Sequence, residues 1–239
     1  AGVKRIVCVT PPTKYFNPYI LGLFDELGIE EVYQIGGAHS IAAMAYGTKT
    51  IKPVNKIFGP GNAYVTTAKK NVFGKVGIDL IAGPSEIVVV ADKENNPAWV
   101  ASDLIAQAEH DEKAQAILIT DSEYFAKKVV SYINDFIKKL STKNIIKKSL
   151  KNYGAIIIVD NLSSSSEIIN LIAPEHLHLQ NKSSNSIFKR VRNAGAIFIG
   201  PHSSEAFGDY IVGTNHVLPT SSSSRFSSGL GVLDFMKRT

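Results

Sequence analysis

Three side chains in separate parts of the sequence have the chemistry of metal ligands. Gln107 and His110 lie three residues apart near the end of a predicted helix at 97–110. At about 1.5 Å rise per residue and about 3.6 residues per turn, this spacing puts both on one helical face, within reach of a single ion. Asp209 adds a carboxylate from a glycine-flanked turn. Since Cys8 is the only cysteine, any metal must be held by nitrogen and oxygen ligands.

Each of these residues also has a plainer explanation. A histidine near a helix end is often a dipole-stabilised surface residue, and an aspartate beside a glycine is common in turns for backbone reasons. A glutamine carbonyl is an unusual and weak zinc ligand. The residues alone would therefore rank only His110 and Asp209 as candidates and leave Gln107 as a helix surface residue.

A carboxylate and an imidazole stand side by side at Glu175 and His176. The preceding Pro174 pushes Ala173 toward extended geometry, which predicts the start of a strand. Because neighbouring side chains on a strand point to opposite faces, the pair can share a site only at an irregular strand edge; otherwise one of them faces solvent. The pair suits an alcohol oxidation. An imidazole with an ordinary pKa of about 6.5 can take the hydroxyl proton as hydride leaves, and the carboxylate can activate water.

A GPGN loop at 59–62 precedes a predicted helix that begins near Ala63. Glycines before a helix N-terminus let backbone N–H groups approach a phosphate, which fits a dinucleotide, but a plain tight turn explains them equally well. No GxGxxG fingerprint is present, so a standard Rossmann cofactor site is not indicated. Ser85 is equally well explained as a turn hydroxyl, and His216 as a satisfied loop histidine.

Short β-rich runs alternate with helical patterns, which predicts an α/β protein with parallel sheets. Strands are expected at 5–9, 31–35, 56–58, 78–81, 87–91, 116–120, 155–159, 176–179 and 196–199, and helices at 17–27, 40–46, 63–73, 97–110, 122–140, 164–171 and 186–193. These strands, with their short connections, fit two small Rossmann-like sheets better than one wide sheet. A Gly-Pro turn at 83–84 separates two strand runs, so we place the domains at residues 1–84 and 85–239.

The composition excludes several classes of protein. With 239 residues, 44% hydrophobic and 20% charged, and no apolar run near the about 20 residues that span a bilayer, we expect a soluble globular protein without a membrane partner. The N-terminal residues lack a signal peptide, and the single cysteine excludes an internal disulfide, so a reducing cytoplasm is expected. The net charge of +5 reflects lysines concentrated at 127–151, on one face of an amphipathic stretch. Aromatic residues do not interleave there as base stacking requires, which argues against nucleic-acid binding.

Several motifs together resemble the histidinol dehydrogenase family. They occur in the order GPGNAYV, IAGPSEI, QAEHD, APEHL, GDYIVGTNHVLPT and SSGLGVLDFMKR. The resemblance runs along nearly the whole chain, and agreement in order and approximate spacing makes it highly specific. It implies two small Rossmann-like α/β domains, and an enzyme that oxidises L-histidinol through histidinal to L-histidine with NAD and zinc, as a homodimer.

The resemblance also implies a role for each candidate residue. Gln107, His110 and Asp209 bind zinc, His176 is the base, and Glu175 activates water. Six residues line the substrate site: Ser85, Gln107, His110, His176, Asp209 and His216. NAD contacts Asn62 and the position of His39. At His39 the family motif GGAQA reads GGAHS, so an imidazole with one donor or acceptor replaces the paired groups of an amide.

Compared with the family, the sequence is incomplete at both ends. It lacks an N-terminal part with a tyrosine that helps to hold NAD, and a C-terminal helical segment that carries the fourth metal ligand and a substrate-binding glutamate. In the family dimer this segment reaches the partner's site, so we expect little turnover from these 239 residues alone. The alternative is an inactive truncated paralogue that serves as a scaffold or interaction protein. Retention of every catalytic side chain within the covered span favours the enzyme.

Overall fold

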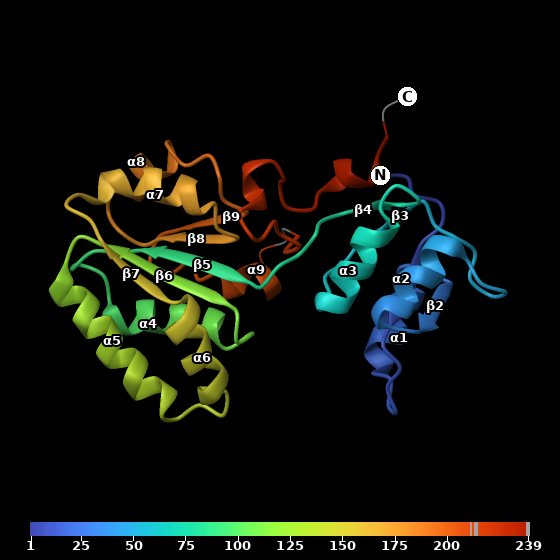
Figure 1. Ribbon diagram of the computed structural model, residues 1–239, viewed down its shortest axis with the longest axis horizontal. Helices are drawn as coiled ribbons and strands as arrows, with labels where there is room; N and C mark the ends of the chain where they lie inside the picture. Colours follow the sequence, from blue (N-terminus) through green and yellow to red (C-terminus); the bar gives the residue numbers. More distant parts are fainter. Residues whose placement is uncertain (211, 213–214, 238–239) are drawn as a thin grey trace. The chain divides into compact units, whose positions relative to one another are not determined.

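The structure is a computed structural model that describes residues 1–210, 212 and 215–237, without the side chain of Asp209 (Figure 1). It divides into two compact units, which are described separately. Unit 1 consists of Ala1–Ala82 and the residues from Leu230 onward, and unit 2 is Gly83–Gly229. Every described strand pairing is parallel, which confirms the predicted α/β class.

Unit 1 alternates short strands and helices. Strands β1 (Val7–Thr10) and β2 (Glu31–Gln34) form one parallel pair, and β3 (Lys56–Ile57) and β4 (Gly77–Ile78) form another. The helices are α1 (Pro18–Glu26), α2 (Gly37–Tyr46) and α3 (Ala63–Val72). A small apolar core joins α2, α3 and β3, and its buried members are Ile41, Met44, Ala45, Ile57, Val72 and Val76.

The described residues from Leu230 onward belong to unit 1, whereas the sequence predicts them in the second domain. The ring of Phe235, in the short 3-10 helix Val232–Phe235, stacks on Phe58 with centroids 4.1 Å apart. Lys56 Nζ donates to the carbonyl of Asp234. These contacts join residues that are far apart in the sequence, so a boundary read from a local turn signal does not detect them.

A buried ion pair holds the loop that precedes α3. Lys69, on α3, forms a salt bridge with Asp79, and both side chains are almost fully buried. Lys69 Nζ also donates to the Gly59 carbonyl at 3.0 Å, and the Gly59 N–H donates to Asp79 Oδ2 at 2.7 Å. Gly59 has a φ of +118°, which residues with a side chain rarely adopt. The N–H and the carbonyl of Gly59 are therefore both bound by the buried pair of Lys69 and Asp79.

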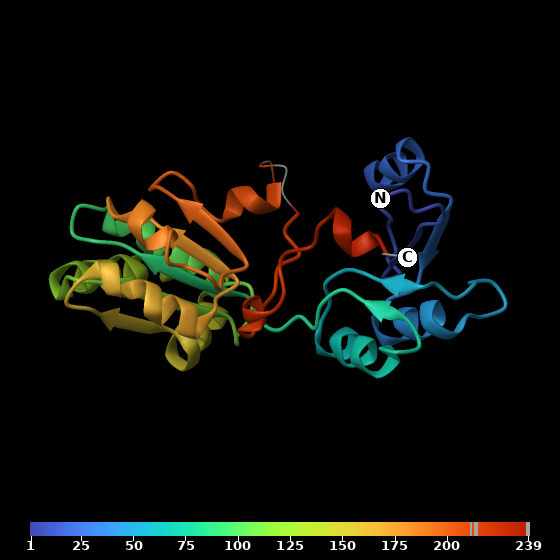
Figure 2. The same cartoon turned by 90° about the horizontal axis from the view of Figure 1, so that it is seen from above.

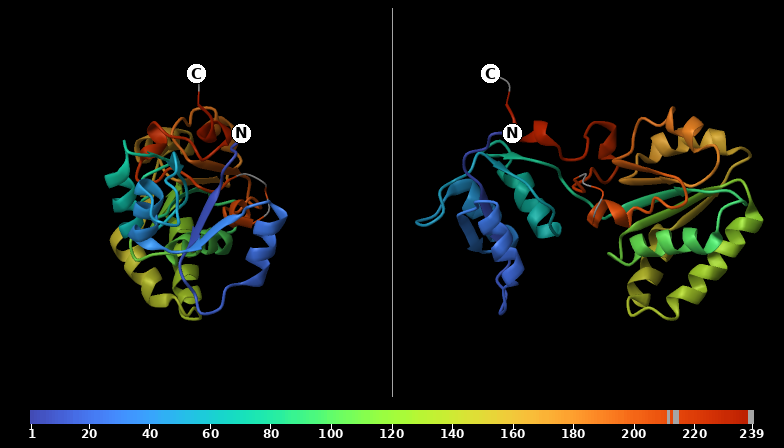
Figure 3. Two further views of the ribbon diagram at one scale, coloured as in Figure 1. Left: turned by 90° about the vertical axis from the view of Figure 1, so that its right-hand side faces the viewer. Right: turned by 180° about the vertical axis from the view of Figure 1, so that it is seen from behind.

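Unit 2 is built on a five-stranded sheet with the order β7-β6-β5-β8-β9. Its strands are β5 (Glu86–Val90), β6 (Gln115–Thr120), β7 (Ala155–Ile158), β8 (His176–Leu179) and β9 (Ala196–Ile199). One face carries α4 (Pro97–Ala108), α5 (Glu123–Ile137) and α6 (Lys143–Tyr153), and the other carries α7 (Ser165–Ile172) and α8 (Ser184–Phe188) (Figures 1 and 3). After β9 the chain forms the short helix α9 (Ala206–Tyr210) (Figure 2). Two 3-10 turns, Leu162–Ser164 and Ser223–Arg225, complete the unit.

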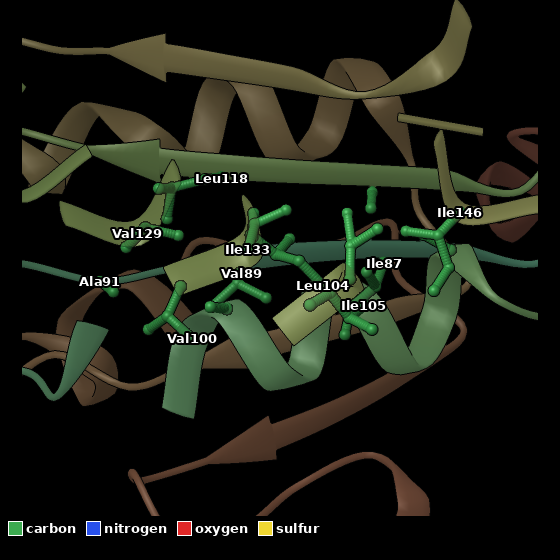
Figure 4. Packing of buried hydrophobic residues seen from close by; sticks show 14 of the residues in the cluster. Ile87, Val89, Ala91, Val100, Leu104, Ile105, Leu118, Val129, Ile133 and Ile146 are labelled. Atoms are coloured by element: carbon green, nitrogen blue, oxygen red, sulfur yellow. The ribbon is translucent and has the colours of Figure 1, made fainter. Parts of the chain in front are cut away.

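The side chains of β5 alternate between the two faces of this sheet. Ile87 and Val89 pack against α4 and α5 (Figure 4), while Val88 and Val90 pack with Leu177 of β8 on the opposite face. All of them are buried. A strand that is covered on both faces needs apolar side chains at every position, which explains the continuous apolar run along β5.

Three local predictions differ from the structure. Hydrogen bonding divides the strands of unit 1 into two pairs, so the described residues form three sheets where two were predicted. The predicted helix at 122–140 is α5, and a second helix, α6, which was not predicted, covers the rest of the lysine-rich stretch. Helix α4 ends at Ala108, two residues before the predicted end, and Glu109 is its C-cap.

Lys69→Met should destabilise unit 1 by about 3–5 kcal/mol, because it leaves the Asp79 carboxylate buried without its cation. Hydrogen exchange of peptides from residues 54–82 measures the free energy of opening. Lys148→Met breaks the exposed pair with Glu112 and serves as the matched control, with an expected cost below about 1 kcal/mol in unit 2. Equal effects of the two substitutions would contradict the role assigned to the buried pair.

Candidate active site

Glu86, the first residue of β5, holds the carboxylate of Glu175 and the imidazole of His176 together. Its backbone N–H donates to Glu175 Oε2 at 3.0 Å, and its carbonyl accepts from His176 Nδ1 at 2.9 Å. The same carboxylate oxygen lies 3.6 Å from His176 Nδ1. Parallel pairing of β5 with β8 sets His176 beside Ile87, so the backbone of one residue reaches both side chains. Both side chains are buried.

These contacts decide which ring nitrogen of His176 carries a proton. A carbonyl oxygen only accepts, so Nδ1 is the donor toward Glu86. In the neutral ring Nε2 then carries the lone pair, and it lies 2.8 Å from Nε2 of His216. His216 Nε2 is therefore the donor in that contact. His176 presents a basic nitrogen toward His216, as a general base requires.

A strained turn before β8 brings Glu175 and His176 into one site. The sequence predicts extended backbone at Ala173, and this prediction is wrong, because Ala173 has φ 53° and ψ 59°, in the left-handed region. Its N–H donates to the carbonyl of Ile169 at 2.7 Å, and its carbonyl accepts from Ser224 Oγ at 2.9 Å. These contacts outweigh the local preference of a residue before proline. Glu175 lies just before the strand, so alternation along β8 does not separate it from His176.

The two metal-ligand candidates near the end of α4 differ in environment. Gln107 is 2% exposed, and its Oε1 has no hydrogen-bond partner among the described residues. His110 lies beyond the end of α4 and is exposed, and its N–H donates to the Gln107 carbonyl at 3.3 Å. Helix α4 ends before His110, so His110 lies just outside the helix in which it was predicted. A buried amide oxygen without a donor costs free energy that a bound cation would remove.

Asp209 lies in helix α9, where the sequence predicts a turn, and its side chain is outside the described part of the structure. The preceding Gly208 packs against the ring of His216: a Cβ at Gly208 would lie 2.5 Å from His216 Nδ1. The backbone of α9 therefore approaches the ring that contacts His176. Among the described residues, no group of three or more His, Cys, Asp or Glu side chains is placed to hold a metal ion. Gln107 is of another residue type, and the side chain of Asp209 is not among those described.

The candidate cofactor residues lie in unit 1. Asn62 caps helix α3, because its Oδ1 accepts from the backbone N–H groups of Tyr64 and Val65 at 3.1 and 3.2 Å. His39 is an exposed residue in the first turn of α2. The substrate-site candidate Ser85 belongs to unit 2, where it is half-buried directly before β5.

Three polar residues of unit 2 were not singled out from the sequence. Glu86 holds the catalytic candidates through its backbone, and its own carboxylate accepts from the N–H of Ser221 at 3.0 Å. Asp103 of α4 and His178 of β8 form a buried pair, with Asp103 Oδ2 3.0 Å from His178 Nδ1. The sequence spacing could have identified His178, because residues i and i+2 of a strand share a face and His176 comes two residues earlier.

Comparison with known proteins identifies the class to which this α/β fold and buried site belong. The model of the family "Histidinol dehydrogenase" matches residues 1–239. Histidinol dehydrogenases of Rhodospirillum rubrum and Nitrobacter winogradskyi are 55% and 54% identical to it, over 100% of this chain and 56% of each relative. The crystal structure of histidinol dehydrogenase from Elizabethkingia anophelis superposes with a TM-score of 0.91 at 40% identity, covering 96% of this chain and 54% of that one.

The chain therefore belongs to the histidinol dehydrogenase family. It spans about half the length of the curated relatives it matches. Within the described residues, no helix is both long and apolar enough to cross a bilayer.

Burial raises the pKa of the Glu86 carboxyl above its ordinary value of 4.5, against a weaker lowering by hydrogen bonds with the backbone of Ser221 and Glu175. The folded state therefore binds this proton more tightly than the unfolded state does. The resulting stabilisation is fully present below the ordinary pKa, and it is lost as the pH rises through the raised pKa of the folded state.

Glu86→Gln should consequently raise Tm at neutral pH, and the gain should disappear below the ordinary glutamate pKa. Thermal unfolding followed by circular dichroism across this pH range measures the difference. Asp135→Asn is the control of opposite sign, because Lys138 lowers the pKa of that exposed carboxyl, and it should lower Tm at neutral pH. If the Tm of the wild-type chain and that of the Glu86 variant changed with pH in the same way, Glu86 would be excluded as the source of the pH-dependent stabilisation.

Proposed function

We propose that this chain is part of an enzyme that oxidises L-histidinol through histidinal to L-histidine, with NAD and zinc, in histidine biosynthesis. The observation that carries the proposal is the buried pair of Glu175 and His176, whose side chains both bind the backbone of Glu86. Oxidation of an alcohol to an acid needs a base in both steps and activated water in the second. The pair supplies both groups.

In the first oxidation, His176 Nε2 takes the hydroxyl proton of the substrate as hydride leaves the same carbon. NAD, when bound, accepts the hydride in each oxidation. The substrate hydroxyl replaces the N–H of His216 as the donor to Nε2. The Glu86 carbonyl stabilises the imidazolium that forms, because it holds the Nδ1–H of the same ring.

In the second oxidation, Glu175 takes a proton from the water that adds to the aldehyde carbon. The N–H of Glu86 orients this carboxylate through Oε2. After His176 has released its first proton to solvent, the resulting hydrate anion gives its hydroxyl proton to His176 as the second hydride leaves, and the product is a carboxylate. One backbone position of β5 thus orients the groups for both steps.

We assign the zinc ligands of this chain to Gln107, His110 and Asp209. Gln107 fits the assignment, because a cation would give its buried Oε1 the partner that the described residues do not provide. His110 follows α4 closely and is exposed, so its ring is able to turn toward an ion beside Gln107. Zinc, when bound, would polarise the substrate oxygen as a Lewis acid.

NAD is assigned to unit 1, where it contacts Asn62 and His39. Since Asn62 Oδ1 caps α3, its amide nitrogen is the group directed to a ligand. The imidazole of His39 offers one donor or acceptor from an exposed position. In unit 2, Ser85 and His216 line the substrate site with the two catalytic residues.

The proposal includes a homodimer of the complete protein in the cytoplasm, acting on a small molecule and binding neither nucleic acid nor membrane. Support for a protein partner comes from α1, in which no residue is buried. Its apolar side chains Tyr19, Leu21 and Leu23 are exposed to solvent. Apolar side chains that gather in this way usually mark an interaction surface. Sedimentation velocity of a protein of full family length distinguishes a dimer from a monomer.

Gln107→Leu should weaken zinc binding by at least about 10-fold without lowering the Tm of the metal-free chain, because it removes a buried unsatisfied acceptor together with a ligand. His110→Ala should weaken zinc binding as well. Competition with a chromophoric chelator measures each Kd. The matched control is His202→Ala, which removes an exposed histidine whose ring lies tilted against Trp99 and should leave the zinc Kd unchanged. Equal zinc affinity in His110→Ala and the wild-type chain would remove His110 from the site.

In a protein of full family length that carries this sequence, His176→Asn should slow both oxidations by about 10² to 10⁴-fold, because each needs proton removal. Glu175→Gln should slow mainly the oxidation of histidinal, the step that needs activated water. Assays started separately from histidinol and from histidinal, both followed by NAD reduction, resolve the two steps. His202→Asn is the control for loss of a histidine. An unaltered rate in the His176 variant would refute its assignment as the base.

A further inference from the structure

A buried carboxylate, Asp103 on α4, binds donors from three other parts of unit 2. Its Oδ2 accepts from His178 Nδ1 at 3.0 Å and from Gln180 Nε2 at 2.7 Å. Its Oδ1 accepts from Ser204 Oγ at 3.2 Å. His178 lies in β8, Gln180 directly follows β8, and Ser204 lies in the segment between β9 and α9. None of these residues has a part in the reaction described above.

Both ring nitrogens of His178 lie within hydrogen-bond distance of an oxygen atom. Nε2 faces the carbonyl of Gly200 at 2.8 Å, and Nδ1 faces the Asp103 carboxyl group. The amide nitrogen of Gln180 is 3.3 Å from Nδ1 and closer to Asp103, to which it donates. The contact between the imidazole and the carboxyl group is buried, with 1% of the His178 side chain exposed.

Each segment that Asp103 joins carries a residue of the proposed active site. Gln107 lies one turn after Asp103 on α4, so its backbone moves with that of Asp103. His176 lies two residues before His178 on the same face of β8. Ser204 leads into α9, where Gly208 packs against the ring of His216. The Asp103 carboxylate is thus a common link between the proposed metal ligand, the proposed base and the ring that contacts it.

We propose that Asp103 and His178 are positioning residues, which set the register of α4 against β8 and α9 and so hold Gln107 at a fixed place relative to His176 and His216. This inference rests on the proposed function of that site. The apolar contacts of α4 with the sheet favour burial but tolerate small shifts, because hydrophobic attraction is not directional. A carboxylate with three directed hydrogen bonds restricts such shifts, since these bonds weaken steeply with distortion.

The test compares zinc affinity, ring signals and stability in four single variants of this chain and in the double variant Asp103→Asn/His178→Leu. Asp103→Asn replaces the carboxyl group with little change of shape, and His178→Leu removes both ring nitrogens. His178→Asn retains a donor near the position of Nδ1 and serves as the conservative rescue. Ser149→Ala is the matched control, because it removes a buried hydrogen bond to the Ala114 carbonyl elsewhere in unit 2.

Zinc Kd is measured by chelator competition well below Tm, and the imidazole ¹H–¹⁵N signals of His176 and His216 are recorded without metal. We expect Asp103→Asn and His178→Leu each to weaken zinc binding by about 10-fold and to shift the signals of both rings. The double variant should bind zinc no more weakly than the worse single variant, because the two residues form one link. His178→Asn should recover part of the affinity, and Ser149→Ala should change neither readout.

Unchanged zinc affinity and unchanged ring signals in Asp103→Asn and His178→Leu, with Tm lowered as in Ser149→Ala, would overturn the inference. Additive losses in the double variant would also overturn it. If the wild-type chain binds no zinc, the proposed metal site fails and the ring signals alone decide. Shifts of the His176 and His216 signals in the Asp103 and His178 variants but not in Ser149→Ala would then still support the positioning role.

Discussion

The parallel register between β5 and β8 is the constraint on which the candidate site depends. It sets His176 beside Ile87 and leaves the backbone N–H and carbonyl of Glu86 to bind the two catalytic candidates. A slip by one residue would turn His176 to the opposite face of the sheet, where Leu177 now packs in an apolar cluster. Burying an imidazole there without its partner would be costly. The packing of the core therefore enforces the geometry of the candidate catalytic pair.

This register also explains why the site lies at the amino-terminal edge of the sheet in unit 2. Glu86 and His176 are the first residues of their strands, and Gln107 lies in the last turn of α4, which returns across the sheet after β5. Ligands of open parallel sheets usually bind at the carboxyl ends of the strands. At the amino-terminal edge, backbone groups at the start of β5 are available to bind side chains, and the proposed chemistry uses these groups.

Much of the fold could be predicted because it follows from local patterns. Apolar runs predict β5 and β6, and asparagines that precede a proline, Asn17 and Asn96, mark the starts of α1 and α4. The features that could not be predicted depend on contacts between distant residues. Ser224, 51 residues further along the chain, binds Ala173 in its left-handed turn, and Asp103 meets His178 across 75 residues. Motif resemblance supplied the candidate site residues, and the roles assigned to them remain predictions.

Several features around the site each lower the stability of unit 2. Ala173 has a left-handed conformation before a proline, Gln107 has a buried oxygen without a donor in the described structure, and Glu86 bears a carboxyl group whose ionisation burial opposes. The strands of the sheet follow the ordinary rule of apolar side chains. Ser165 Oγ, Gln180 Oε1 and Asn181 Nδ2 of unit 2 are also buried without a partner among the described residues, so such departures are not confined to the candidate site. At the candidate site they coincide with residues that the proposed function uses, where binding sets the requirement. The pair of Asp103 and His178 lies among them and differs in kind, because its polar atoms have partners and its contribution is to fix position.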